Sequence, residues 1–254
     1  MSRIISICNQ KGGVGKTTTA INLASGLAYL TKSVLLIDLD SQSNATSGLG
    51  LNKDEIEFSA YDVLVDEKRP QDGILQTSIE FLDLLPSNVD LVGTEVELVN
   101  MSNRENRLKE ALATITNSYD YIFIDCPPSL GLLTINALTA SDSVLIPIQC
   151  EYYAMEGLTQ LMKTIHLVRS SLNPQLQLEG VLMTMFDQRA NLSNQVVAEV
   201  KKFFGKKAYK TIIPRNVRVA EAPSHGKPVF FYDASSRGSL AYLDFAKEFL
   251  NIAD

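Results

Sequence analysis

A glycine-rich stretch near the start of the chain, KGGVGKTT at residues 11–18, contains the residue types that hold a phosphate group. It follows an apolar run at 3–9 and precedes a segment with helical spacing. Glycines let the backbone turn its N–H groups toward phosphate oxygens, and the start of the following helix attracts the same anion. In such a loop the last lysine reaches the β- and γ-phosphates, and the hydroxyl beside it ligates Mg2+. The residues predicted to bind ATP are Lys11, Gly12, Gly13, Val14, Gly15, Lys16, Thr17 and Thr18.

Three aspartates at the ends of apolar, strand-like runs could serve the same nucleotide. Asp125 ends the run YIFID, and Asp38 and Asp40 end the run SVLLIDLD. In a P-loop protein a carboxylate at such a strand end holds magnesium, directly or through a water molecule. Asp125 is therefore predicted to be a magnesium ligand, although an aspartate at a strand end can also be a simple turn former.

Short β-rich runs alternate with longer helical segments, which predicts an α/β fold with a doubly wound, mostly parallel sheet and helices on both faces. No linker or internal repeat interrupts the alternation, so residues 1–254 are expected to form a single P-loop ATPase domain. Strands are expected at 3–9, 33–40, 81–86, 121–125, 143–148, 180–186 and 210–213. Helices are expected from 17 to about 30 and at 104–117, 131–140, 154–172, 193–204 and 237–251.

The composition, 45% hydrophobic and 20% charged, is ordinary for a globular protein. The chain has no run of about eighteen apolar residues that would span a membrane and no signal peptide, so a cytoplasmic protein is expected. Its cysteines, Cys8, Cys126 and Cys150, form no C-x-x-C pair and are expected to be small buried side chains. This argues against a zinc site, a disulfide framework and an iron–sulfur cluster.

Charge is distributed unevenly along the chain. The net charge is −6, but residues 187–228 contain nine basic and three acidic residues, which leaves this segment at +6 and the remainder at −12. Such asymmetry indicates a surface for a polyanion such as DNA. The same charges also suit a solvated helix face, and charge alone does not separate the two interpretations.

The phosphate loop departs from the general P-loop pattern, because Gln10 stands where that pattern has glycine and Lys11 adds a second lysine. These features match the deviant Walker A motif K-G-G-x-G-K-[ST]. The chain thus resembles the ParA/MinD group of P-loop ATPases and, within it, the chromosomal ParA (Soj) partitioning proteins. The resemblance runs nearly end to end and is carried by NQKGGVGKTTTAINLA (9–24), DLDSQSNATSGLG (38–50), IFIDCPPSLGLLTINAL (122–138), NLSNQVVAEVKK (191–202) and IIPRNVRVAEAPSHGKP (212–228).

The resemblance implies three catalytic residues. Lys11 would cross a dimer interface to the partner's ATP, Lys16 would bind the phosphates, and Asp40 would position the attacking water. The family commonly reads D-x-D-P-Q-G-N after this strand, whereas this chain has Ser41 and Ser43 in place of the proline and glycine, so a more flexible loop and an altered turnover rate are expected. The implied magnesium ligands are Thr17, Asp38 and Asp125.

Two further sites follow from the resemblance. Pro214 and Asn216 would line the adenine pocket, where an amide can meet the donor and acceptor edges of a base. Arg189 and Arg218 would contact DNA without reading its sequence, since guanidinium groups stay charged and grip phosphate bidentately. Nearby lysines could enlarge this surface or simply be solvated: Lys201, Lys202, Lys206, Lys207 and Lys210.

The resemblance implies an ATPase that dimerises on ATP, binds DNA non-specifically, is nucleoid-associated and releases DNA on hydrolysis, with a ParB-like partner stimulating the cycle of chromosome or plasmid partitioning. Two alternatives keep the same fold: an ATPase that positions another cargo, and a MinD-like membrane ATPase. The last segment, 238–254, has more acidic than basic residues, unlike the basic amphipathic helix of MinD-like proteins, so no membrane partner is expected. The phosphate loop begins at residue 11, so the N-terminal DNA-reading domain of plasmid-type relatives is not expected. A scaffold that binds ATP without hydrolysing it is the rival outside the enzyme class.

Overall fold

The computed structural model describes residues 2–151 and 154–252, which form an eight-stranded sheet. Neighbouring strands run parallel except at one edge, where the first two strands of the spatial order are antiparallel. In spatial order the strands are β3 (Leu75–Gln76), β4 (Leu82–Leu85), β2 (Val34–Asp38), β5 (Tyr121–Asp125), β1 (Arg3–Ile7), β6 (Ser143–Gln149), β7 (Gln177–Phe186) and β8 (Ala208–Pro214).

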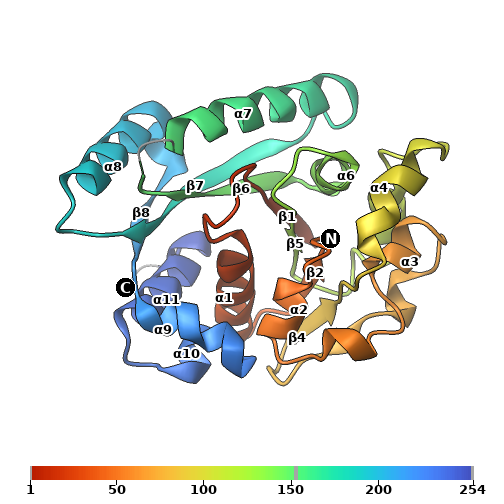
Figure 1. The fold of residues 1–254 in the computed structure, drawn as a ribbon, viewed down its shortest axis with the longest axis horizontal. Helices are drawn as coiled ribbons and strands as arrows, with labels where there is room; N and C mark the ends of the chain where they lie inside the picture. Colours follow the sequence, from red (N-terminus) through yellow and green to blue (C-terminus); the bar gives the residue numbers. More distant parts are fainter. Residues whose placement is uncertain (1, 152–153, 253–254) are drawn as a thin grey trace.

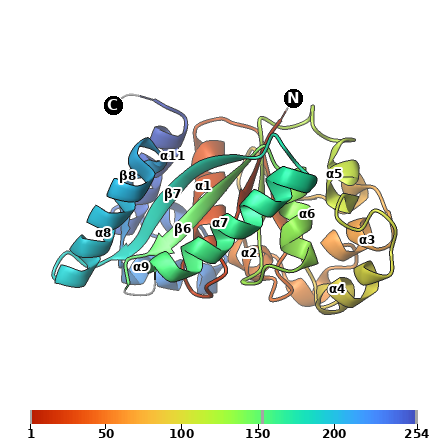
Figure 2. The same cartoon turned by 90° about the horizontal axis from the view of Figure 1, so that it is seen from above.

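Helices cover both faces of this sheet (Figure 1). Figure 1 shows α6, α7 and α8 along one face and α1, α9, α10 and α11 along the other, and Figure 2 shows α7 lying over β6 and β7. The helices are α1 (Lys16–Tyr29), α2 (Asn44–Gly48), α3 (Ala60–Leu64), α4 (Leu91–Val99), α5 (Arg107–Leu112), α6 (Leu132–Ala140), α7 (Ala154–Ser171), α8 (Asn191–Phe204), α9 (Val217–Glu221), α10 (Val229–Tyr232) and α11 (Arg237–Phe249). Short 3-10 turns lie at Lys53–Glu55, Pro70–Asp72, Gly205–Lys207 and Ala222–His225.

Two hydrophobic cores lie on opposite faces of the sheet, and alternate residues of each central strand enter them. In β2, Val34 and Leu36 belong to the core under α1 and α11, whereas Leu35 and Ile37 belong to the core under α6 and α7. Side chains of a strand alternate between faces, so a strand covered on both sides must be apolar throughout. The predicted doubly wound α/β fold is confirmed.

The strand order places one loop at the centre of the sheet. β1 lies between β5 and β6, and strands of the first half of the chain lie on its β5 side while later strands lie on its β6 side. In open α/β sheets ligands bind where the order reverses, outside the carboxyl ends of the strands. The loop that follows β1 is therefore in the place where a parallel sheet binds its ligand.

Some predicted elements differ from the structure. The helix expected at 104–117 is only Arg107–Leu112, because residues 114–118 are rich in Thr, Asn and Ser, which favour turns. The helix α4 was not predicted, since its sequence LVGTEVELV contains three valines and a glycine and has low intrinsic helix propensity. Within the described residues, no helix is both long and apolar enough to cross a bilayer.

Candidate active site

The loop between β1 and α1 has the backbone shape of a phosphate cradle. Gly13 and Gly15 have φ values of 73° and 88°, in the left-handed region that glycine adopts without strain. Gly15 is the N-cap of α1, and no described side chain caps this helix start or places an acid in its first turn. The positive end of α1 is thus available to an anionic ligand, and phosphate binding by residues 11–18 stays a prediction.

Lys16 is a buried cation inside this loop. Only 6% of the residue is exposed, and its Nζ donates a hydrogen bond to the backbone oxygen of Lys11 at 3.1 Å. Burial lowers the pKa of Lys16, and the negative charge of Asp125 opposes that shift. A partly desolvated ammonium attracts a phosphate more strongly than one in bulk water.

Lys11 points to a different partner. Its Nζ lies 2.9 Å from Oε2 of Glu151, and both side chains are partly exposed. Glu151 follows β6 and is also contacted by Gln149 Nε2 and, at 4.0 Å, by the guanidinium of Arg215. Lys11 therefore lies at the exposed rim of the loop, whereas Lys16 lies inside it.

Asp125 and Asp38 are buried at the carboxyl ends of adjacent strands, where β5 and β2 pair in register. Neither carboxylate oxygen of Asp125 has a hydrogen-bond partner among the described residues. Burial raises the pKa of Asp125 well above its usual range, the charge of Asp38 raises it further, and the nearby Thr17 and Lys16 lower it. Burying a carboxylate without a partner costs free energy, so a cation bound beside Asp125 would stabilise it.

The carboxylate of Asp38 accepts hydrogen bonds from the protein on both of its oxygens. Its Oδ1 accepts a hydrogen bond from the amide of Asp40 at 3.1 Å, and its Oδ2 accepts two from Thr46, from the amide at 2.9 Å and from the hydroxyl at 2.8 Å. Burial nevertheless raises the pKa of Asp38 to about 6. Asp38 thus organises the loop after β2 and faces Asp125 as a second, already hydrogen-bonded carboxylate.

These residues fit a magnesium ion that arrives with its nucleotide. The described residues contain no group of three His, Cys, Asp or Glu side chains suited to hold a metal. Mg2+ does not need such a cage, because it usually takes one or two carboxylates, hydroxyls or waters together with phosphate oxygens. The unpaired oxygens of Asp125 and the Thr17 hydroxyl beside it supply donors of this kind.

Asp40 lies in a short, tightly bonded loop. It is 8% exposed, its Oδ1 accepts from the amide of Gln42 at 3.0 Å, and its backbone oxygen accepts from the Ser87 hydroxyl at 2.7 Å. Ser43 has a φ of 54°, the left-handed conformation for which glycine is the usual residue. The serine therefore keeps the glycine-type backbone, and the expectation of a more flexible loop finds no support in these contacts.

A pocket of about 250 Å³ adjoins the phosphate loop. It brings Gly15 and Thr18 together with Pro214 and Asn216, as the proposed adenine site requires. The Asn216 side-chain oxygen accepts hydrogen bonds from the amides of Arg218 and Val219 at 2.9 and 3.3 Å, so it caps α9. Its amide NH2 group is what this residue can offer to a base.

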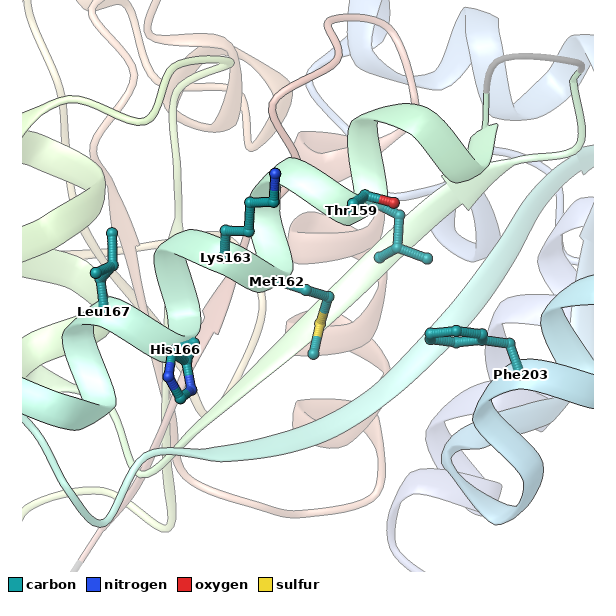
Figure 3. A pocket seen from close by; sticks show the side chains of 7 residues that line it. Thr159, Met162, Lys163, His166, Leu167 and Phe203 are labelled. Atoms are coloured by element: carbon teal, nitrogen blue, oxygen red, sulfur yellow. The ribbon is translucent and has the colours of Figure 1, made fainter.

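A larger cavity of about 570 Å³ lies elsewhere, between α7 and α8 (Figure 3). Met162 and Phe203 approach each other across it from the two helices, and Lys163 points away (Figure 3). Its lining is largely apolar and includes no residue of the phosphate loop. Of these two pockets, only the smaller one adjoins the phosphate loop.

The two arginines predicted to contact DNA follow the carboxyl ends of neighbouring strands. Arg189 follows β7 and Arg218 follows β8, and the two strand ends are register partners. Both guanidinium groups form salt bridges with neighbouring carboxylates. Arg189 pairs with Asp187 at 3.1 Å. Arg218 pairs with Glu221 at 2.8 Å and with Asp233 at 3.2 Å. The lysines of the basic segment are exposed at 201, 202, 206, 207 and 210.

Sequence reasoning missed three residues of the site. Glu151 holds Lys11, Thr46 holds Asp38, and Thr184 donates from its hydroxyl to the backbone oxygen of Val14 at 2.8 Å. Thr46 lies in a stretch that carries the family resemblance, whereas Glu151 and Thr184 lie outside those stretches, and the roles of Glu151 and Thr184 depend on contacts between distant segments. The three cysteines are buried, as expected.

Comparison with known proteins relates the whole chain to partitioning proteins. Residues 2–178 match a family model described as an AAA domain. The chain is 61% identical over 248 residues to the sporulation initiation inhibitor protein Soj of Bacillus subtilis, covering 98% of both chains. It is 55% identical over 250 residues to the chromosome partitioning protein ParA of Myxococcus xanthus, covering 98% of this chain and 88% of that one.

Solved structures agree with this fold. The structure of cobyrinic acid a,c-diamide synthase from Mycobacterium smegmatis with bound ADP and magnesium superimposes with a TM-score of 0.86 at 37% identity, covering 99% of this chain and 95% of that one. That neighbour thus combines the same architecture with bound ADP and magnesium.

Proposed function

The chain belongs to the ParA/Soj family of chromosome-partitioning ATPases, and from that membership we propose a cycle in which ATP drives it to dimerise and to bind DNA non-specifically. The protein is an ATPase that uses ATP and Mg2+. Hydrolysis would return it to a monomer that leaves DNA, and a ParB-like protein would stimulate that step. We propose that residues 1–254 act as one such domain, associated with the nucleoid.

The position of Lys11 carries the proposal of a dimer. Its ammonium is at the rim, paired with Glu151, while Lys16 occupies the interior of the loop. A second cation beside the γ-phosphate would stabilise the charge that spreads over it during transfer. The Lys11 ammonium pairs with Glu151 rather than with a group of the phosphate loop, which is consistent with a role at the nucleotide of a facing copy.

Hydrolysis would depend on Asp40. Its carboxylate lies in the loop after β2, fixed by Gln42 and by the bond from Ser87 to its backbone. A carboxylate held in this way can orient an attacking water in line with the phosphorus, and such positioning is the main contribution a protein makes to phosphoryl transfer. When bound, Mg2+ would neutralise the phosphate charge, with Thr17 and Asp125 as its protein ligands and Asp38 supporting Asp125.

DNA binding would use the basic segment at 187–228. Arg189 and Arg218 are exposed enough to meet a phosphate, with 90% and 50% of their side chains accessible. Each arginine would exchange its carboxylate partners for phosphates. The net gain in binding free energy is therefore smaller than it would be for an unpaired guanidinium. This is consistent with a weak, sequence-independent contact that a dimer doubles.

Retention on unrelated DNA with ATP, with ADP and without nucleotide tests the proposal, together with phosphate release in the same samples. We expect binding only with ATP, and for about four neutralised phosphates a slope of roughly −3.6 in log affinity against log salt. Arg218→Glu should abolish retention while nucleotide affinity persists, and Lys163→Glu on α7 is the matched control. Binding to anionic liposomes in place of DNA would favour the MinD-like alternative, and ATP-independent retention would overturn the cycle.

A further inference from the structure

Thr184, near the end of β7, is hydrogen-bonded to the phosphate loop at the end of another strand. Its hydroxyl donates to the backbone oxygen of Val14 at 2.8 Å, and Thr184 and Val14 are each only 2% exposed. A Cβ placed on Gly15 would lie 3.8 Å from the methyl carbon of Thr184, so this side chain packs against the same part of the loop. The backbone of Thr184 is fixed as well, because its carbonyl oxygen accepts from the amide of Cys150 at 3.1 Å.

One peptide unit carries both the Val14 carbonyl and the Gly15 N–H. A trans peptide is planar, so its C=O and N–H bonds point in opposite directions. By taking the Val14 oxygen as its acceptor, the Thr184 hydroxyl therefore also sets the direction of the Gly15 N–H, which points away from Thr184. Within the described residues this N–H donates to no backbone oxygen.

This peptide unit is one that would turn easily without a partner. Gly15 has a φ of 88°, and glycine adopts left-handed and right-handed φ values with little difference in energy. A half turn of the peptide would put the Val14 carbonyl oxygen where the N–H had been, and its partial negative charge would repel a phosphate. Gly13 and Gly15 are left-handed on either side of Val14, an alternation that makes neighbouring N–H groups converge on an anion.

We propose that Thr184 is a positioning residue for the phosphates, whose hydroxyl holds the Val14–Gly15 peptide so that the Gly15 N–H faces the bound nucleotide. The inference rests on the proposed function, in which the phosphate loop binds ATP. In such a loop the backbone N–H groups surround the α- and β-phosphates, which ATP and ADP share. Thr184 therefore strengthens the binding of both nucleotides, and it acts on binding more than on the hydrolytic step.

The isosteric change Thr184→Val tests the hydroxyl. A methyl group then faces the buried Val14 oxygen, so titration with fluorescent ATP and ADP analogues should show both affinities reduced about tenfold or more, by similar factors. Thr184→Ser keeps the hydroxyl and should stay within about threefold of wild type.

Thr77→Val is the matched control. It removes a hydrogen bond of the same kind, from the Thr77 hydroxyl to the backbone oxygen of Leu82 at 2.7 Å, beside β3 and β4 at the opposite edge of the sheet. Thermal unfolding should show a comparable loss of stability in Thr77→Val and Thr184→Val, whereas only Thr184→Val should lose nucleotide affinity.

Kinetics and a ligand without a base separate positioning from other roles. In Thr184→Val the KM for ATP should rise by about the same tenfold, while kcat should fall by less than about threefold. Calorimetry should show that tripolyphosphate, which lacks adenosine, loses affinity by the same factor as ATP.

Three results would overturn the assignment. Unchanged tripolyphosphate affinity beside weakened ATP would place the effect of Thr184 in the base pocket. A Thr184→Ser protein as weak as Thr184→Val would show that the hydroxyl is not what matters. An equal loss of nucleotide affinity in Thr77→Val would reduce the effect to general stability. Normal ATP affinity in Lys16→Ala would instead count against the phosphate loop as the ATP site, and so against the proposed function.

Discussion

Asp38 and Asp125 are register partners on β2 and β5, yet the described residues donate hydrogen bonds to only one of the two carboxylates, that of Asp38. Asp38 accepts three hydrogen bonds, and Asp125 accepts none from the described residues. The strand register brings two buried carboxylates together, which is unfavourable without a cation. Asp38 therefore orders the loop after β2 through its hydrogen bonds, whereas the oxygens of Asp125 remain open to the magnesium ion that we propose it binds.

Asp125→Ala should weaken nucleotide binding itself. Removing the unpaired carboxylate deletes a magnesium ligand, so we expect ATP affinity in the presence of Mg2+ to fall by about tenfold or more, while affinity measured with EDTA changes little. Titration with a fluorescent ATP analogue measures both. An unchanged affinity with Mg2+ would remove Asp125 from the metal site. Lys16→Ala should be more severe and leave almost no binding under either condition.

Asp40→Ala should separate binding from hydrolysis. The phosphate loop and Asp125 remain intact, so ATP should still bind and the dimer should persist on DNA, while phosphate release falls by at least about a hundredfold. Single-turnover hydrolysis and DNA retention are the measurements. Hydrolysis at the wild-type rate would exclude Asp40 as the catalytic carboxylate and make Asp38 the next candidate.

Gly12→Val should block dimerisation without unfolding the monomer. A Cβ at Gly12 meets only Pro128 at 4.0 Å, an ordinary contact, and Gly12 does not have the positive φ of its neighbours. The valine would project where a second phosphate loop is proposed to face the first. Gel filtration with ATP should give a monomer that still binds nucleotide. A dimer of normal strength would contradict the facing arrangement.

Ser43→Gly should stabilise the protein slightly. The serine is held at a φ of 54°, which costs an L-residue roughly 1–2 kcal/mol, while glycine adds about 0.5–1 kcal/mol of chain entropy. The net gain of about 0.5 kcal/mol corresponds to a rise in Tm of roughly 1–2 °C for a domain of this size. Thermal unfolding monitored by circular dichroism checks it, with Ser43→Ala as the control that keeps the strain.

The sequence is a good guide to the parts of the site that are local. The phosphate loop is continuous in the chain, and Asp38 and Asp125 each end an apolar strand, so pattern and chemistry suffice. Glu151 and Ser87 are different, because they reach the site only when β6 and β4 are placed beside β1 and β2. The helix α4 was missed for another reason, since tertiary packing of Leu91 and Leu98 overrides its low propensity.

The sheet is regular on one side of β1 and irregular at its far end. Strands β2, β5 and β1 pair without interruption, whereas the β7–β8 pairing shifts register twice, next to Met183, and Met185 has a positive φ. The phosphate loop extends from the first region, and the pocket with Pro214 and Asn216 extends from the second. We expect the regular region to protect its amides from hydrogen exchange more strongly than the irregular one does. A nucleotide that spans both regions would then couple them. Amide hydrogen exchange of β8 would then slow on ATP binding far more than that of β5, and the ligand would serve as part of the protein's cooperative folding unit.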